Sequence, residues 1–238
     1  MKSIAISQPR YLPALNYLQR IAITDVFVLL DNVQRQSRGI ENRNKILTSG
    51  KPQWLTIPIA SSSREKIQNT VVSNDGWIEH HKKSLHFTYC KHPYYNRELI
   101  EAYYKDLNSL NYVDMIETML TNLCEIFGIK INFVRTSSLS INQDITGVEN
   151  LYVISKDLKA DLYLSGSNGR DYGVKECFEG NQPKIKVLFH DFDYPVYAQF
   201  GNSAQNFQPW LCFFDPLFNL GTDKIKELIF NKPLLRER

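Results

Sequence analysis

The sequence predicts an α/β protein, and two features of the chain lead to this fold class. At its start, a short apolar strand at Ile4–Ile6, an amphipathic helix at about 13–23 and a second apolar strand at 26–30 follow one another in the order of a βαβ unit. Strand and helix patterns then alternate over most of the chain. The second strand is a continuous apolar run, which is typical of a strand buried on both faces of a parallel sheet. We therefore expect a Rossmann-like, mostly parallel sheet with flanking helices.

The later elements are predicted from apolar spacing and turn signals. Val113, Ile116 and Leu120 recur at helical spacing and Gly128 supplies a stop, so this helix spans 112–127. The other expected elements are a hairpin at 45–47 and 53–59, helices at 76–104 divided near Pro93, a strand at 131–134, a helix that starts with a capping box at Thr146 and Glu149 and runs through Leu158, strands at 161–164 and 185–189, and a helix at 223–230.

The chain is expected to form one domain. Its 238 residues suit one large domain, and no internal repeat or low-complexity linker divides them. The middle of the chain is mostly helical, whereas strands and helices alternate on either side of it. We therefore expect a single α/β domain over 1–238 with a helical insertion at about 76–128.

Composition and charge exclude several classes of protein. Hydrophobic residues make up 43% and charged residues 22%, which is typical of a globular chain rather than a disordered or fibrous one. The formal net charge of +3 gives no support to DNA binding. No secretory signal is present, and no apolar run approaches the roughly 20 residues that span a bilayer. We expect a cytoplasmic protein without a membrane span.

No transition-metal site is expected. The four cysteines lie far apart and none forms a CxxC pair, so they are interpreted as reduced thiols. His81, His86 and His92 are five and six residues apart, whereas a helical zinc pair requires a spacing of four. Most of the histidines are therefore interpreted as structural or solvent-facing. His81 is a candidate general base, because an unperturbed histidine titrates near neutral pH.

Polar segments follow three of the predicted strands, and ligands of open α/β sheets bind beyond the carboxyl ends of strands. After the first strand, Gln8 and Arg10 lead into a helix N-terminus, where backbone N–H groups favour an anion. After the strand at 161–164, the segment 165–169 (Ser-Gly-Ser-Asn-Gly) resembles a phosphate cradle, although it is not a Walker A loop. The alternative in both places is an ordinary turn.

The third segment follows the second predicted strand. Asp31 and Gln34 stand at the end of this strand, and Arg43 follows a few residues later. A carboxylate at such a place suits a metal, an amine or a sugar hydroxyl, and an arginine suits bidentate binding of a phosphate or carboxylate. The alternative is a surface turn with an Asp–Arg pair of little energetic value.

Ten motifs occur in a fixed order along nearly the whole chain. They are Gln8-Pro9-x-Tyr11-Leu12-Pro13, Asp25-Val26-Phe27-Val28, Asp31-x-Val33-Gln34, Asn42-Arg43-Asn44-Lys45-Ile46, Trp54-Leu55-Thr56-Ile57-Pro58, Trp77 with His81, Tyr89-x-Lys91 with Pro93-Tyr94-Tyr95, Leu164-Ser165-Gly166, Pro195-Val196-Tyr197-x-Gln199 and Asp215-x-Leu217-Phe218-Asn219-x-Gly221. This ordered set resembles the WbqC-like protein family of bacteria. The family usually has histidine where Ser7 stands and asparagine where Arg10 stands, so the chain departs from the family pattern at both positions.

The resemblance implies an enzyme of bacterial surface-polysaccharide (O-antigen) biosynthesis that transfers glycine, or another aminoacyl or acyl group, to an amino sugar nucleotide. A second and fainter likeness links the opening strand, turn, helix and strand to the nucleotidylyltransferase and pantothenate-synthetase superfamily. It implies ATP with Mg²⁺ as the cofactor, because enzymes of that kind form amides through an acyl-adenylate. The expected partners are then a nucleotide sugar and an amino acid.

The same likenesses imply a role for each candidate residue. Gln8 and Arg10 are expected to hold phosphate. The expected catalytic residues are His81, which accepts the proton of the amine, and Asp31. The remaining candidates are expected to bind substrate, and they are Tyr11, Gln34, Asn42, Arg43, Asn44, Trp54, Ser165, Ser167, Asn168, Tyr197 and Gln199.

Two alternative functions stay open at this point. A transferase that takes its acyl group from aminoacyl-tRNA or from a thioester predicts no binding of ATP. A non-catalytic module that holds a sugar nucleotide for a partner enzyme predicts binding without turnover. Substitutions of Arg43 and His81 separate a module from an enzyme, because a module is expected to lose affinity at Arg43 and little at His81.

Overall fold

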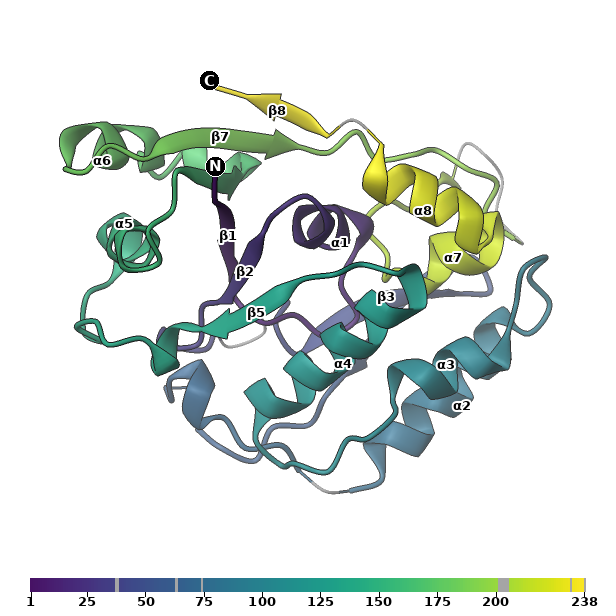
Figure 1. The fold of residues 1–238 in the computed structure, drawn as a ribbon. Coiled ribbons are helices and arrows are strands. Elements are labelled where there is room, and N and C mark those ends of the chain that lie inside the picture. Colours follow the sequence, from purple (N-terminus) through teal and green to yellow (C-terminus); the bar gives the residue numbers. More distant parts are fainter. Residues whose placement is uncertain (37–38, 63, 74, 201–205, 232, 238) are drawn as a thin grey trace.

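The fold is given by a computed structural model, which describes residues 1–36, 39–62, 64–73, 75–200, 206–231 and 233–237 (Figure 1). A six-stranded sheet has the strand order β5-β2-β1-β6-β7-β8, and a separate hairpin pairs β3 with β4. The strands are β1 (Ser3–Ser7), β2 (Val26–Leu29), β3 (Arg43–Thr48), β4 (Lys51–Thr56), β5 (Asn132–Arg135), β6 (Leu162–Gly166), β7 (Lys186–Asp191) and β8 (Leu234–Arg236). Neighbouring strands of the sheet are parallel except β7 and β8. The predicted α/β fold with a mostly parallel sheet is confirmed.

The order of the strands places a ligand-binding position at the middle of the sheet. Numbered along the chain, the six strands have the order 3-2-1-4-5-6, as in doubly wound dinucleotide-binding sheets. The chain builds outward from β1 through β2 and β5, and then returns to the other side of β1 with β6. Strand β1 pairs with β6 through Ser3 with Leu162 and Ile4 with Tyr163, near the start of both strands. The carboxyl ends of β1 and β6 are therefore the switch point, where such sheets bind their ligands.

Helices cover both faces of the sheet. They are α1 (Leu15–Ala22), α2 (Trp77–Tyr89), α3 (Arg97–Tyr103), α4 (Tyr112–Phe127), α5 (Gly147–Asp157), α6 (Val174–Gly180), α7 (Phe214–Leu220) and α8 (Thr222–Phe230). One face carries α5 and α6, and the other carries α1, α4, α7 and α8 (Figure 1). Ile4 belongs to the apolar cluster on the α5 side, whereas its neighbour Ala5 belongs to the cluster on the α1 side. Because successive strand residues point to opposite faces, both faces of the central strands must be apolar.

The helical middle of the chain packs into the main core. Helices α2 and α3 lie on either side of Pro93, as the sequence predicts, and α4 has the predicted bounds. Trp77, Tyr103 and Leu120 from these helices share one apolar cluster with Ala5 and Phe27 of the sheet. The expected insertion at 76–128 is therefore continuous with the core on the α1 side of the sheet.

Three short elements and one helix cap differ from the sequence-based expectations. Helix α7 was not expected because six of its seven residues are buried, so it lacks the polar face that marks a surface helix. Helix α6 and strand β8 were also missed, and β8 is only three exposed residues at the antiparallel edge of the sheet. The side chain of Thr146 forms no capping hydrogen bond, so α5 begins without the predicted capping box.

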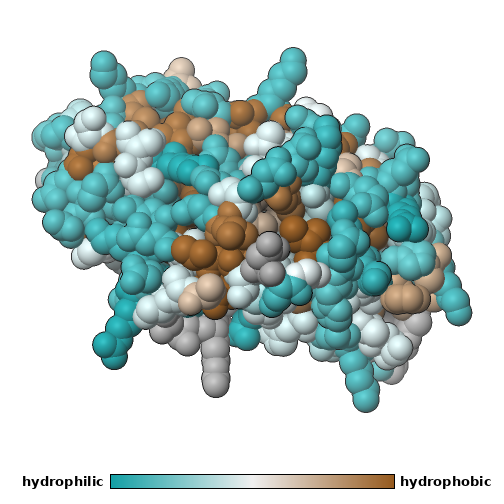
Figure 2. Space-filling view, turned by 90° about the horizontal axis from the view of Figure 1, so that it is seen from below, coloured by the Kyte–Doolittle hydropathy of each residue, from teal (hydrophilic) through white to brown (hydrophobic). Residues whose placement is uncertain are grey.

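The surface is mostly hydrophilic with local apolar groups. Figure 2 shows the lower face of Figure 1, where apolar side chains gather near the middle and hydrophilic side chains surround them. Large apolar side chains that are exposed in the described chain include Phe87, Tyr94 and Trp210. None of the helices in the described ranges is long and apolar enough to cross a membrane.

Candidate functional site

A cavity of about 1400 Å³ lies at the carboxyl ends of β1, β6 and β7. The starts of two helices also reach it, through Asn16 of α1 and Gly147 of α5. Neither helix start has a side-chain cap, so their first backbone N–H groups remain available to a ligand. The predicted substrate-binding residues that line the cavity are Gln8, Arg10, Gln34, Ser165, Ser167 and Asn168. The structure therefore brings together the segments after β1 and β6, as expected for a switch point.

Two arginines supply positive charge to the cavity wall. Arg10 follows β1, and Arg20 projects from α1. Both guanidinium groups lie over the ring of Tyr17, at 5.5 and 5.8 Å from its centroid. Within the described residues neither arginine forms an ion pair with a carboxylate, and Nε of Arg10 is buried without a hydrogen-bond partner. Arg10 and Arg20 are thus cations without a carboxylate partner in the described chain, which favours an anionic ligand.

Arg20 lies at the switch point itself. Its Nη2 donates a hydrogen bond of 3.1 Å to Oγ of Ser7, the last residue of β1. A Cβ atom at Gly166, the last residue of β6, would lie 2.9 Å from Nη1 of Arg20. The guanidinium is therefore close to the ends of both strands. Burial, and secondly the charge of Arg10, lower the pKa of Arg20, which is the electrostatic cost of a buried cation without an acidic partner.

The loop after β6 is closely packed. The segment predicted as a phosphate cradle forms a short 3-10 helix at Ser167–Arg170. Ser167 and Asn168 are exposed within the cavity lining, whereas Ser165 is buried and donates a hydrogen bond of 3.1 Å to the carbonyl oxygen of Gly166. Ser167 and Asn168 are thus the side chains of this loop that a ligand can reach.

Replacing Gly169 by alanine is expected to destabilise the protein by about 1–3 kcal/mol, because the new Cβ has no space. It would lie 2.0 Å from Oγ of Ser165 and 3.3 Å from the ring of Phe189. Replacing Ser165 by alanine as well removes the closest contact, so the double variant should recover part of the loss. Urea unfolding of the single and double variants measures both effects. A Gly169→Ala protein as stable as the wild type would contradict the close approach of this loop to β6.

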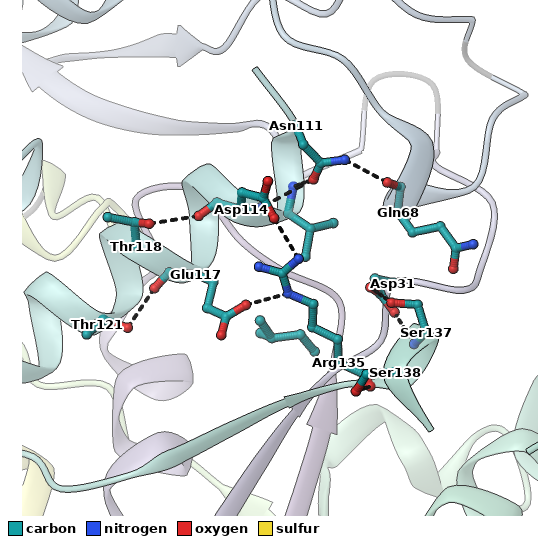
Figure 3. Close-up of polar contacts among 12 residues, drawn as sticks. Asp31, Gln68, Asn111, Asp114, Glu117, Thr118, Thr121, Arg135, Ser137 and Ser138 are labelled. Atoms are coloured by element: carbon teal, nitrogen blue, oxygen red, sulfur yellow. Dashed lines mark hydrogen bonds and ion pairs between the residues drawn. The ribbon is translucent and has the colours of Figure 1, made fainter. Parts of the chain in front are cut away.

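Asp31 is held by the turn after β5 and does not belong to the described cavity lining. Its carboxylate accepts hydrogen bonds from the backbone N–H and the hydroxyl of Ser137, at 2.8 and 2.6 Å (Figure 3). Nearby, Arg135 forms ion pairs with Asp114 and Glu117 of α4. These contacts join the ends of β2 and β5 to each other and to α4. The expected catalytic role of Asp31 stays a prediction, while its neighbour Asn32 reaches the cavity instead.

His81 also lies apart from the lining that the described residues form. Its Nδ1 is 2.7 Å from the hydroxyl of Tyr11, which in turn contacts the hydroxyl of Tyr104. The ring of Trp77 lies edge-on to His81, with the ring centroids 5.2 Å apart. Burial lowers the pKa of His81 to about 4. Tyr11 and His81 therefore join the turn after β1 to α2, and their expected roles in binding and catalysis stay predictions.

Four predicted substrate-binding residues lie in the β3–β4 hairpin or directly before it, outside the cavity lining of the described residues. Asn42 donates a hydrogen bond to the carbonyl oxygen of Ile57, and Asn44 donates one to that of Leu12. The half-exposed ring of Trp54 lies against the guanidinium of Arg43 and the ammonium of Lys45, at 4.3 and 4.8 Å. The two asparagines therefore fasten the hairpin to the rest of the fold, while Arg43 and Trp54 form a cationic and aromatic surface.

Tyr197 and Gln199 surround a buried carboxylate on α7. The hydroxyl of Tyr197 donates a hydrogen bond of 2.6 Å to Oδ1 of Asp215, and Nε2 of Gln199 lies 3.3 Å from the same atom. Gln199 also exchanges two hydrogen bonds with the backbone of Gln208. Burial raises the pKa of Asp215 to about 6. These contacts fasten the segment before α7, whose members Phe192 and Trp210 line the cavity.

Among the cavity residues that the sequence reasoning missed are Arg20 and His190. Arg20 lies among apolar positions of an amphipathic helix, and nothing in its spacing distinguishes it from a solvent-facing arginine. His190 follows the apolar run of β7, so the rule that polar residues after strands form sites would have found it.

Comparison with known sequences and family models identifies the family of this chain. An uncharacterized protein of Mycobacterium tuberculosis is 28% identical over 227 residues, which cover 94% of this chain and 96% of that protein. No solved structure matches the chain. A model of the WbqC-like protein family matches residues 8–227, a range that contains β2, β5, β6 and β7 of the sheet and the segment that follows β1. The chain belongs to the WbqC-like protein family.

Proposed function

We propose that this protein binds an amino sugar nucleotide in the cavity and transfers glycine, or another aminoacyl or acyl group, to its amine during synthesis of a bacterial surface polysaccharide. One observation carries the proposal: Arg10 and Arg20 lie at the switch point without a carboxylate partner in the described chain. A nucleotide sugar carries a diphosphate, and guanidinium groups bind phosphate oxygens through paired hydrogen bonds.

The size of the cavity supports a reaction between two substrates. Pockets for a single small molecule have volumes of roughly 300–1000 Å³. The cavity of about 1400 Å³ is larger, so an acyl donor has room beside the nucleotide sugar. Ser167 and Asn168 offer hydroxyl and amide groups to the part of the ligand beyond the phosphates.

The implied cofactor, ATP with Mg²⁺, fits the donor groups of the cavity. Arg10, Arg20 and the start of α1 suit a triphosphate as well as they suit a diphosphate. No group of three or more His, Cys, Asp or Glu side chains capable of holding a metal ion occurs in the described ranges. Mg²⁺ would therefore be bound mainly through the phosphates, as is usual for this ion. ATP would supply the energy that activates a free carboxylate.

A thermal melting screen tests the proposal on the purified full chain. Its arms are ATP with Mg²⁺, UDP-sugars, dTDP-sugars and glycine, alone and in pairs, and mass spectrometry of the paired arms detects any new amide. A ligand at 100 times its dissociation constant is expected to stabilise the protein by about 2.7 kcal/mol. Stabilisation by a nucleotide sugar, together with an acylated product, supports the proposal. Absence of stabilisation by any nucleotide would contradict it.

The separate arms of the screen also distinguish the sources of the acyl group. Stabilisation by ATP, with release of AMP, supports an adenylating enzyme. Stabilisation by a nucleotide sugar but not by ATP supports a donor such as aminoacyl-tRNA or a thioester. Both outcomes are compatible with the same acceptor site.

A second candidate function is a non-catalytic module that holds the nucleotide sugar for a partner enzyme. The contacts of the predicted catalytic residues favour it, because Asp31 is engaged by Ser137 and His81 by Tyr11. A module predicts nucleotide-dependent stabilisation with no amide product in any paired arm.

A further inference from the structure

We infer that His190 is the general base of the proposed transfer, and that Gln19 is the residue that positions its ring. The inference rests on the proposed function. His190 lies near the carboxyl end of β7 and lines the cavity. It pairs in register with Gly166, beside which the guanidinium of Arg20 lies. A proton acceptor is thus placed next to the group that would hold the phosphates of the acceptor substrate.

The hydrogen bonds of Gln19 determine which ring nitrogen is free. Nε2 of Gln19 donates a hydrogen bond of 2.7 Å to the carbonyl oxygen of Leu228, so the amide oxygen Oε1 faces His190. Oε1 lies 2.6 Å from Nε2 of His190 and can only accept a hydrogen bond. Nε2 of the neutral imidazole must therefore carry the proton, and Nδ1 keeps a lone pair. An amide that orients the ring in this way leaves one nitrogen able to accept a proton.

Burial and the charge of Arg20 keep His190 neutral before reaction. Burial, and secondly the charge of Arg20, lower the pKa of His190 to about 4. The neighbouring Asp191 opposes this effect, but its carboxylate is engaged by Arg170 at 2.8 and 2.9 Å and by Arg236 of β8 at 3.4 Å. At neutral pH the lone pair on Nδ1 is therefore free to act.

The proposed step is attack of the acceptor's uncharged amine on an activated acyl donor, which is an acyl adenylate, an ester or a thioester. The nitrogen lone pair forms the new C–N bond at the acyl carbon. The bond from this carbon to the leaving oxygen or sulfur breaks, and the leaving group departs with the electron pair. The proton lost by the nitrogen moves to Nδ1 of His190, and the positive charge that forms on the ring is shared with Oε1 of Gln19 through the Nε2 hydrogen bond.

Kinetics of variants, measured with the substrate pair found in the melting screen, test the inference. His190→Gln is expected to lower kcat about 10²- to 10⁴-fold, which is the usual contribution of a general base, with KM for the nucleotide sugar changed less than about threefold. Gln19→Glu keeps an acceptor oxygen and adds a negative charge, so it should move the acidic limb of the pH–rate profile to higher pH. His80→Gln, on the exposed face of α2, is the matched control and should behave as the wild type.

Chemical modification gives a readout that does not require turnover. Diethyl pyrocarbonate modifies neutral imidazole nitrogens, and mass spectrometry locates the modified residues. His190 is expected to react and to be protected by saturating UDP, whereas the exposed His80 should react equally with and without UDP.

The outcomes separate the inference from the function on which it rests. A wild-type protein that binds no nucleotide and forms no amide contradicts the proposed function. If the wild-type protein forms the amide and the His190→Gln variant turns over at the normal rate, the inference is overturned and the function stands. Binding of UDP without protection of His190 likewise overturns the inference.

Discussion

Replacing Arg20 by methionine is expected to lower the affinity for UDP about 10- to 150-fold, because hydrogen bonds to charged groups contribute about 1.5–3 kcal/mol. The free energy of unfolding is expected to stay equal or to rise. Arg20 is a buried cation that donates a hydrogen bond to the neutral hydroxyl of Ser7, so its burial costs energy in the absence of a ligand. Isothermal titration calorimetry with UDP and urea unfolding measure the two quantities.

The controls for Arg20 separate charge from geometry. Arg20→Lys keeps the charge but loses the planar fork, so its affinity for UDP is expected to lie between those of the wild type and Arg20→Met. Arg97→Met removes an exposed arginine on α3, outside the cavity lining, and should leave UDP binding unchanged. A protein that loses stability but keeps its affinity for UDP after Arg20→Met would mean that Arg20 is structural.

Replacing Asp215 by alanine is expected to destabilise the protein by about 3 kcal/mol or more. The fully buried carboxylate accepts hydrogen bonds from the hydroxyls of Tyr197 and Tyr89 and from the amide of Gln199, so truncation leaves buried donors without an acceptor. Each such group costs about 1–3 kcal/mol. Urea unfolding at pH 7 measures the loss. A change below about 1 kcal/mol would show that this network contributes little to the stability of the fold.

The contribution of the same carboxylate to the free energy of unfolding depends on pH. Burial raises the pKa of Asp215 from 3.8 to about 6, so between these values the folded state holds a proton that the unfolded state has lost. Its stabilising contribution is therefore complete below about pH 3.8 and is lost as the pH rises through about 6. The contribution amounts to about 3 kcal/mol.

An Asp215→Asn variant isolates this contribution. His81 and His190, whose pKa values are lowered to about 4, act in the opposite sense in the same range of pH but are common to both proteins. The difference in unfolding free energy between wild type and variant should therefore decrease from pH 4 to pH 7. A difference that does not change with pH would place the pKa of Asp215 near its usual value.

Much of the fold could be predicted because its central elements are marked by strong local patterns. Strands β1 and β2 are buried on both faces, so each is a continuous apolar run in the sequence. Helix α4 is buried on one face, so its apolar residues recur at helical spacing. Helix α7 could not be predicted, since it is buried on nearly every side and so has no alternation to detect. Strand β8 depends on pairing with β7, a contact between distant segments.

The site could be predicted where polar residues lie at or shortly after the end of a strand. Gln8, Ser165 and Ser167 follow this rule and line the cavity. Residues chosen because they occur in family motifs do not all line the cavity. Asn42 and Gln199, for example, form hydrogen bonds within the fold instead. Arg20 reaches the switch point only through the packing of α1 against the sheet, which no local pattern reports.

The most direct measurement is a crystal structure of the protein with UDP bound. The account predicts the diphosphate at the carboxyl ends of β1 and β6, within hydrogen-bond distance of Arg10 and Arg20, with the start of α1 beside it. UDP bound elsewhere, for example against Arg43 and Trp54 of the hairpin, with Arg10 and Arg20 left free of phosphate, would contradict it.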